Sequence, residues 1–179
     1  MRRRAIRISL LFPICAVLCL GLLLESKKHK ASTLLSQIPS IGPIRAALLI
    51  ALLQTPDRFR TKRQLWAYSG LAIETHDSAE NMYVNGQLQR SKKQSSIRGL
   101  NSNHNPDLKN LFKSASAVAA VKTGPFQKFY AALIGKGIKP EMARLTLARK
   151  IAAITLIVWK RGVSFDARYL NPQTAGVFP

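Results

Sequence analysis

Four prolines divide much of the chain into segments in which apolar residues recur at helical spacing. Pro43, Pro106, Pro125 and Pro140 each stand at the start of such a segment. Proline suits the first position of a helix because its fixed φ fits the helical backbone and its missing N–H would have no intrahelical partner there. The chain is therefore expected to fold mainly into helices that begin at these prolines.

A polar segment over residues 70–99 interrupts the helical spacing. Asn85 and Gly86 separate the short runs MYV and QLQ, and Asn-Gly between two such runs is typical of a two-residue β-hairpin turn. Ahead of this segment, Thr61 and Gln64 fit a capping box at the start of a helix. The predicted fold class is mainly α: a small helical domain with a helix-hairpin-helix-like start and a polar β-hairpin insertion.

The first thirty residues differ from the rest of the chain. A basic start precedes an apolar run over residues 10–24, and polar, basic residues follow it. This pattern is typical of a signal peptide or a membrane anchor, but the run is shorter than the roughly 20 residues that span a bilayer, and Pro13 lies within it. A third interpretation is a leader joined to a partial gene by accident. We divide the chain into a leader (1–30), a central domain (31–168) and a tail (169–179).

The surplus of positive charge limits the partners that the chain can have. The sequence holds 28 Lys and Arg but only 8 Asp and Glu, a formal net charge of +20. Such a charge favours polyanions, either nucleic acid or an anionic membrane surface. Both cysteines, Cys15 and Cys19, lie in the leader, so the pattern indicates neither a disulfide framework nor a zinc site.

The motif IPSIGPIRAALLI over residues 38–50 has the form of two short helices joined by a turn. In a helix-hairpin-helix unit, free backbone N–H groups at the start of the second helix bind a DNA phosphate without reading sequence. Gly42 would allow the close approach, and Arg45 would add charge. The alternative is a plain helical corner whose glycine serves only the turn.

Two clusters of basic residues follow this motif. Few acids lie among them, so phosphate contact is expected rather than internal ion pairing. Three aromatic residues, Trp66, Tyr68 and Tyr83, are candidates for stacking on bases, with burial in the core as the alternative. The first basic cluster is Arg58, Arg60, Lys62 and Arg63, and the second is Arg90, Lys92, Lys93 and Arg98.

Five motifs then occur in a fixed order: IPSIGPIRAALLIALL, DRFRTKRQLWAYSGL, THDSAE, RGLNSNHNPDLKNLFKSA and ARLTLARKIAAITLIVWKRGVSFD. Together, over about residues 32–168, they resemble the C-terminal domain of the transposases of the IS-one-ten group of bacterial insertion sequences, which are Piv-like and guided by a bridge RNA. The resemblance implies a two-part enzyme. Its N-terminal half is RuvC-like and carries four metal-binding acids, and its C-terminal half carries a serine that attacks DNA and becomes linked to it.

By this resemblance the catalytic serine is Ser78, in the THDSAE motif. The divalent metal, expected to be magnesium, would belong to the RuvC-like half. Because Glu25 is the only acid before Asp57, that half has no counterpart here, and we expect no metal or other cofactor to be bound by this chain. The resemblance therefore implies a truncated transposase that is not expected to transfer strands alone.

The predicted function is DNA binding by the C-terminal domain of an insertion-sequence transposase, in DNA transposition and recombination. The expected partners are DNA, a structured guide RNA and a second copy of the chain, in the cytoplasm and with weak membrane association at most. The alternative function is that of a membrane-anchored basic protein without a catalytic role, with residues 1–24 as its anchor.

Overall fold

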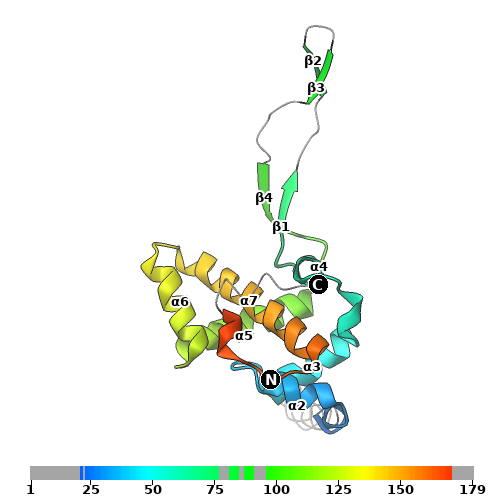
Figure 1. Cartoon of the computed structure of the whole chain (residues 1–179), viewed down its shortest axis with the longest axis vertical. Helices are drawn as coiled ribbons and strands as arrows, with labels where there is room; N and C mark the ends of the chain where they lie inside the picture. The colour runs from blue at the N-terminus through cyan, green and yellow to red at the C-terminus, as the bar shows by residue number, and fades with distance from the viewer. Residues whose placement is uncertain (1–20, 22, 77–80, 85–86, 91–95, 171–179) are drawn as a thin grey trace, which may run out of the picture.

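The computed structural model describes residues 21, 23–76, 81–84, 87–90 and 96–170 of the chain. A body of helices carries a long arm of β-strands (Figure 1), so the predicted fold class is confirmed. The helices are α2 (Lys30–Ser36), α3 (Pro43–Leu53), η1 (Pro56–Arg58), α4 (Lys62–Tyr68), α5 (Pro106–Val121), α6 (Pro125–Gly135), α7 (Pro140–Arg161) and η2 (Ala167–Leu170). The strands are β1 (Ile73–His76), β2 (Asn81–Val84), β3 (Gln87–Arg90) and β4 (Ser96–Leu100).

Local sequence signals set where the helices begin. Helices α3, α5, α6 and α7 each have proline at their first position, as predicted. The side chain of Asn105 caps α5 by accepting hydrogen bonds from the backbone N–H groups of Asp107 and Leu108, at 3.0 and 3.1 Å. The capping box of α4 also forms, between Thr61 and Gln64. These contacts satisfy N–H groups that a helix leaves without partners at its start.

Helix α7 is the centre of the body. With 22 residues it is about 33 Å long, and it packs against α2, α4, α5 and α6 (Figure 1). Leu147, Ala148, Ile151 and Ala152 are completely buried on it. The small alanines allow neighbouring helices to approach closely, and the apolar side chains that they enclose provide most of the stabilisation.

The arm consists of two antiparallel strand pairs. Strand β1 pairs with β4, and β2 pairs with β3. Val84 and Gln87 are partners at the end of the second pair. The predicted turn residues Asn85 and Gly86 come between them in the chain and lie outside the described residues. In the first pair, Glu74 faces Gly99 and Thr75 faces Ile97, which leaves one extra residue as a β-bulge.

The residues that follow β4 fasten the arm to the end of α4. Asn101 Nδ2 donates to the carbonyl oxygen of Ala67 at 3.1 Å, and the N–H of Asn105 donates to Tyr68 O at 2.9 Å. Gly70 has φ +65°, and a Cβ there would lie 2.4 Å from the ring of His104. The RGLNSNHN motif thus has a structural role, because its side chains position the base of the arm.

Candidate nucleic-acid interface

The turn between α2 and α3 presents the start of α3 to solvent. Gly42 is the N-cap of α3, and no side chain caps this end of the helix. The first N–H groups of a helix have no intrahelical acceptors, and Pro43 has no N–H to offer, so those of Ile44 and Arg45 remain for an external anion. An anion at this position is also favoured by the helix dipole.

The conformation of Gly42 does not require glycine. Its φ is −79° and its ψ is 177°, which any residue adopts, and a Cβ at this position would meet nothing within 4 Å. The positive φ of the turn, 75°, belongs to Ser40 instead. The backbone of the turn therefore does not require glycine at position 42, and the space beside it is open.

Ser40 and Arg45 hold the shape of the turn. A left-handed conformation at a residue other than glycine is unfavourable by about 1–2 kcal/mol, and strain of this kind concentrates at functional sites. The Nη1 atom of Arg45 donates a hydrogen bond to Ser40 O at 3.0 Å. The Oγ atom of Ser40 is buried, and no partner for it lies among the described residues. Arg45 thus stabilises the turn in addition to its charge.

The first basic cluster lies around η1 and the start of α4. The guanidinium of Arg58 lies over two aromatic rings, 5.3 Å from the centre of Tyr68 and 5.8 Å from that of Phe59. Arg60 and Arg63 are exposed, and Lys62 is half-buried. Tyr68 packs on Phe59 with ring centres 5.5 Å apart. For Tyr68 the structure therefore agrees with packing against the core, which was the alternative to stacking on bases.

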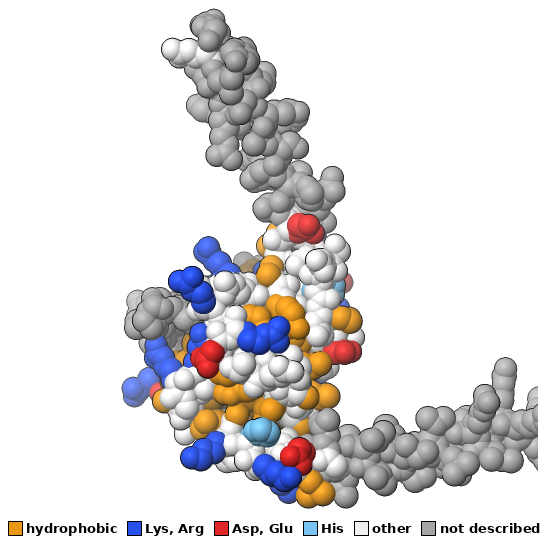
Figure 2. Space-filling view, turned by 90° about the vertical axis from the view of Figure 1, so that its right-hand side faces the viewer, with side chains coloured by type: hydrophobic (Ala, Val, Ile, Leu, Met, Phe, Trp, Pro, Cys, Tyr) orange, Lys and Arg blue, Asp and Glu red, His pale blue; other side chains and the backbone are white. Residues whose placement is uncertain are grey.

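The turn and the first basic cluster lie at opposite ends of α3. This helix has 11 residues and so spans about 16 Å. On the face shown in Figure 2, Lys and Arg side chains stand at several separate places around a central area of apolar side chains. On this face, positive charge is therefore distributed over several places rather than gathered at one point.

The second basic cluster belongs to the arm. Arg90 ends β3 and faces Asn81 of β2, and Arg98 is the extra residue of the bulge in β4. Lys92, Lys93 and Ser78 lie outside the described residues. The two segments that hold them, 77–80 and 91–95, join the same two strand pairs.

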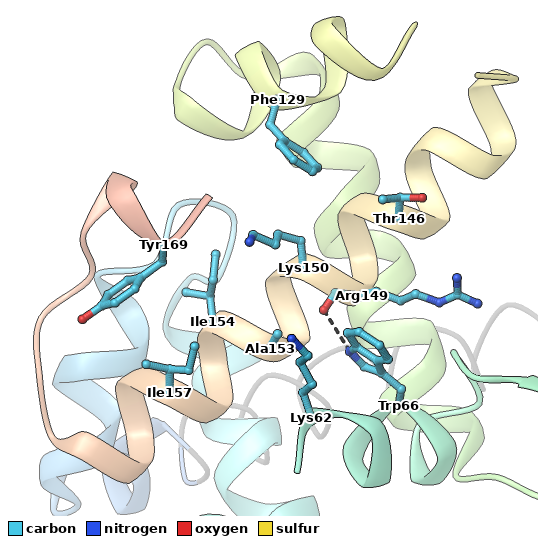
Figure 3. Close-up of a pocket in the computed structure, with 10 residues that line it drawn as sticks. All are labelled: Lys62, Trp66, Phe129, Thr146, Arg149, Lys150, Ala153, Ile154, Ile157 and Tyr169. Atoms are coloured by element: carbon cyan, nitrogen blue, oxygen red, sulfur yellow. Dashed lines mark hydrogen bonds between the residues drawn. The ribbon is translucent and has the colours of Figure 1, made fainter. Parts of the chain in front are cut away.

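A pocket between α4, α6, α7 and η2, here called the α4–α7 pocket, was not predicted from the sequence (Figure 3). Its volume is about 240 Å³. Burial lowers the pKa of Lys150, and the nearby ammonium of Lys62 lowers it further. The lining residues are Lys62, Trp66, Phe129, Thr146, Arg149, Lys150, Ala153, Ile154, Ile157 and Tyr169.

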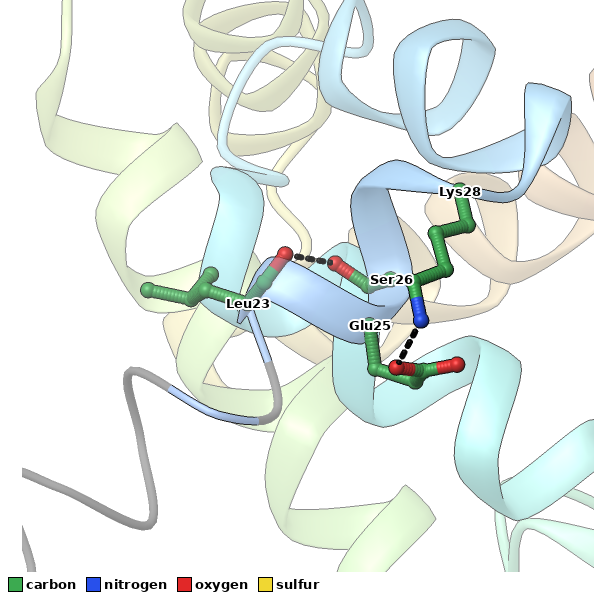
Figure 4. Close-up of polar contacts among 4 residues, drawn as sticks. All are labelled: Leu23, Glu25, Ser26 and Lys28. Carbon is green, nitrogen blue, oxygen red and sulfur yellow. Dashed lines mark hydrogen bonds and ion pairs between the residues drawn. The ribbon is translucent and has the colours of Figure 1, made fainter.

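The described residues include no group of three or more His, Cys, Asp or Glu that could hold a metal ion. Glu25 is bound to Lys28, with 2.7 Å between its Oε2 and the lysine Nζ (Figure 4). The hydrogen bond and charge of Lys28 lower the pKa of Glu25. Both side chains are exposed, so this ion pair stabilises the fold little.

The divalent metal that the resemblance implies has no set of ligands among the described residues, because no three or more His, Cys, Asp or Glu come together there.

The two ends of the chain extend beyond the described residues. No helix among residues 21, 23–76 and 96–170 is both long and apolar enough to cross a membrane. Residues 1–20 and 22 lie outside the described part, and they include most of the apolar run over residues 10–24. Leu170 in η2 is buried, and residues 171–179 of the predicted tail are again outside the described residues.

Comparison with models of protein families places this helical protein among the transposases. The matching model describes the transposase IS116/IS110/IS902 family and covers residues 32–131, more than half of the chain. The chain belongs to this family, which confirms the resemblance found in its sequence. The match includes the α2–α3 turn, the first basic cluster and the arm. A comparison with curated proteins gives no match.

Proposed function

We propose that this chain is a nucleic-acid-binding domain of an IS110-family transposase and holds the DNA backbone at the α2–α3 turn. The observation that carries the proposal is the uncapped start of α3 at Gly42, whose surroundings leave open space where a side chain would stand. A phosphate there would accept hydrogen bonds from the N–H groups of Ile44 and Arg45. The formal net charge of +20 supports binding to a polyanion in the cytoplasm.

The basic clusters would extend this contact along the backbone. Phosphate contacts fix position and orientation rather than sequence, so we propose that a structured guide RNA, not this surface, selects the target. A second copy of the chain is a proposed partner in the assembly. The metal-binding acids would come from a separate RuvC-like part, since the eight acids of this chain are scattered.

Ser78 is the proposed nucleophile, on the strength of the family resemblance. Its Oγ would attack the phosphorus of a phosphodiester, and the bond from phosphorus to the leaving strand oxygen would break. The hydroxyl proton would pass to a base, and the leaving oxygen would take up a proton. Positive charge from Lys92 and Lys93 would stabilise the phosphate in the transition state, because their segment joins the same strand pairs as that of Ser78.

Substitution of Gly42 tests the phosphate site. Gly42→Asp introduces one of the best N-cap residues, so α3 should be as stable as before or more so. The new carboxylate would occupy the place of the phosphate and repel it. We expect the affinity for duplex DNA, measured by fluorescence anisotropy, to fall by about tenfold or more, since hydrogen bonds to a charged group are lost.

Gly124→Asp is the matched control. Gly124 also precedes a proline at the start of an 11-residue helix, and a Cβ there also meets nothing within 4 Å. Both variants lower the net charge by one, so a loss of binding confined to Gly42→Asp identifies the site. Equal effects of the two variants would contradict a phosphate site at the α2–α3 turn. Binding that does not weaken with salt would contradict nucleic-acid binding as a whole.

A further inference from the structure

Helix α3 is apolar on every side. Arg45 is the only polar or charged residue in its sequence, PIRAALLIALL. A helix of this composition normally lies inside a protein, but the structure buries only one side of it, through Ala46, Ala47, Leu49 and Leu53. The opposite side faces a groove between α3 and α5, here called the α3–α5 groove. The described part of the chain therefore leaves an apolar surface of α3 uncovered.

The uncovered side of α3 carries a continuous apolar stripe. Ile44 is 50% exposed and Leu48 is 39% exposed, and Leu52 is half-buried. These residues are four positions apart, and rows with this spacing are the ridges by which two helices most often interdigitate. The groove beside the stripe has a volume of about 670 Å³, and its α5 wall consists of Asp107, Asn110, Leu111 and Ser114. The α3–α5 groove thus has room for side chains of another helix.

The α3–α5 groove carries opposite charges at its two ends. Helix α3 ends beside η1, and Phe59, which follows η1, packs on Tyr68. The carbonyl oxygen of Tyr68 accepts a hydrogen bond from the N–H of Asn105, at the start of α5. The start of α5, with the exposed carboxylate of Asp107, therefore lies toward the end of α3. Arg45 lines the groove at the other end, the start of α3.

We propose that the α3–α5 groove binds helix α3 of a second copy of this chain, so that two copies form a symmetric pair with their α3 helices antiparallel. A two-fold axis at Leu48 places this residue against its own copy and Ile44 against the partner's Leu52. The same symmetry brings Arg45 of each copy to the Asp107 end of the other copy's groove, where the charges are complementary. Such a surface is used up by one partner, so the assembly closes at two copies. This inference rests on the second copy included in the proposed function and assigns it a surface.

The net charge sets the conditions under which the pair forms. Each copy carries a formal charge of +20, and like charges of this size oppose association. The contact between two 11-residue helices is small, so the pair is reversible rather than permanent. Salt screens the repulsion but leaves the apolar contact in place. The pair should therefore become stronger as the salt concentration rises, whereas binding to duplex DNA becomes weaker.

Sedimentation velocity of the full chain measures the pair directly. Between low and moderate salt, we expect the average mass to rise from the 19.8 kDa of one chain toward twice that value. Leu48→Glu places two carboxylates face to face at the centre of the pair and should weaken association by about tenfold or more. Val118→Glu is the matched control, because Val118 is 41% exposed on α5 and does not line the groove. Both variants lower the net charge by one.

A disulfide tests the symmetry of the pair. In the full chain with Cys15→Ser and Cys19→Ser, Leu48→Cys leaves one thiol, which meets its own copy across the two-fold axis. Diamide accepts the two electrons and two protons released when the two thiols join as a disulfide. We expect a covalent dimer in high yield from Leu48→Cys and little from Val118→Cys in the same background.

The results separate this inference from nucleic-acid binding. The N–H groups at the start of α3 point along the helix axis, whereas the stripe lies on its side, so the pair leaves the phosphate site open. A mass that stays at one chain, equal effects of Leu48→Glu and Val118→Glu, or no preference of the disulfide for Leu48→Cys would overturn the pair while duplex binding stands. An intact pair that does not bind duplex DNA would overturn the phosphate site alone. Salt-dependent doubling of the mass with a selective disulfide at position 48 supports the pair.

Discussion

Glycine occurs in this chain for two different structural reasons, left-handed backbone and a lack of space for a side chain. Gly70 and Gly162 both have left-handed backbone, with φ of +65° and +62°. A Cβ at Gly70 would collide with His104, whereas one at Gly162 would meet nothing within 4 Å. Gly42 has neither a positive φ nor a close neighbour. Nothing inside the fold requires glycine at this position, but a Cβ would also meet nothing within 4 Å at Gly124 and Gly135. The proposal of a ligand at Gly42 therefore depends on the uncapped start of α3.

Substitution of these glycines by alanine should measure the two effects separately. Gly162→Ala should lower the free energy of unfolding by about 1 kcal/mol, the price of left-handed backbone alone. Gly70→Ala should lower it by about 2–4 kcal/mol, because overpacking against His104 is added. Thermal unfolding followed by circular dichroism gives the difference, at about 2–4 °C for each kcal/mol. Equal losses would show that the His104 ring moves aside without strain.

The pKa of Lys150 leads to a prediction about stability and pH. Burial and Lys62 lower this pKa in the folded chain, so the unfolded chain binds more protons over the interval between the lowered pKa and about 10.5. The free energy of unfolding should therefore rise with pH in that interval. Below the interval Lys150 is charged in both the folded and the unfolded chain, and its charge destabilises the fold by the full amount. Lys150→Met should raise Tm at pH 7, and its advantage over the unchanged chain should shrink as the pH approaches 10.5. The other titratable groups that line the pocket with Lys150 are Lys62 on α4, Arg149 on α7 and Tyr169 on η2.

Lys160→Met is the control for this measurement, because Lys160 lies in the last turn of the same helix. Lys160 is exposed, and a change at such a surface position is expected to stay within about 0.5 kcal/mol. A Tm for Lys150→Met below that of the unchanged chain would show that the lysine stabilises the fold through a contact of its own.

At the scale of elements, local signals were sufficient for the helices and the hairpin. Proline at the first position, the side-chain cap of α5 and the Asn-Gly turn act over a few residues, so the sequence alone places them. The turn before α3 was located correctly, but the left-handed residue is Ser40 and not the neighbouring glycine. Glycine tolerates this conformation most easily, but here the conformation belongs to Ser40, whose carbonyl oxygen accepts a hydrogen bond from Arg45.

The α4–α7 pocket could not be predicted in the same way. Its lining comes from residues 62–169, on four elements that only tertiary packing brings together. One signal was present: Arg149 and Lys150 stand in an apolar helical run with no acid three or four residues away. Helical ion pairs require that spacing. Arg149 has its partner outside the helix, at Leu71 O.

The arm is an element whose removal should leave the body folded. His76 and Ser96 are already partners in the β1–β4 pair, so Asn-Gly in place of residues 77–95 should form a two-residue hairpin between them. We expect a Tm equal to that of the full chain or higher. The deletion removes Arg90, Lys92 and Lys93, so the slope of log K against log salt for duplex DNA should fall by up to roughly 2.7, at about 0.9 for each phosphate contact.

A full-length triple variant with glutamine in place of these three cations serves as the control. If charge alone links the arm to DNA, the slope of log K against log salt for the triple variant should equal that for the deletion. A slope unchanged by both would show that the arm does not touch phosphates. A slope lowered by the deletion alone would assign the contact to other groups of the arm.

At the scale of the whole molecule, the helical body and the arm have different physical roles. The body has a continuous apolar core around α7 and carries the α2–α3 turn and the pocket. The arm consists of two-stranded pairs, which are marginally stable by themselves, and its base is fastened by Asn101 and Gly70. A rigid body that holds nucleic acid and a projecting arm that bears a nucleophile would allow binding and chemistry to be separated in space.

Covalent attachment of DNA tests this division of labour. Alone, the chain should form no covalent adduct, because a serine needs activation and the described part of the chain includes no group of three or more His, Cys, Asp or Glu that could hold a metal ion. Addition of a full-length family member with an intact RuvC-like half, but with its own serine replaced, should yield a phosphoserine link on Ser78. Ser78→Ala should abolish the link, and Ser91→Ala, in the other connecting segment of the arm, should retain it. Mass spectrometry of the protease-digested adduct identifies the residue. Efficient strand transfer by the isolated chain, or an adduct that persists in Ser78→Ala, would assign the nucleophile and its activation to other residues.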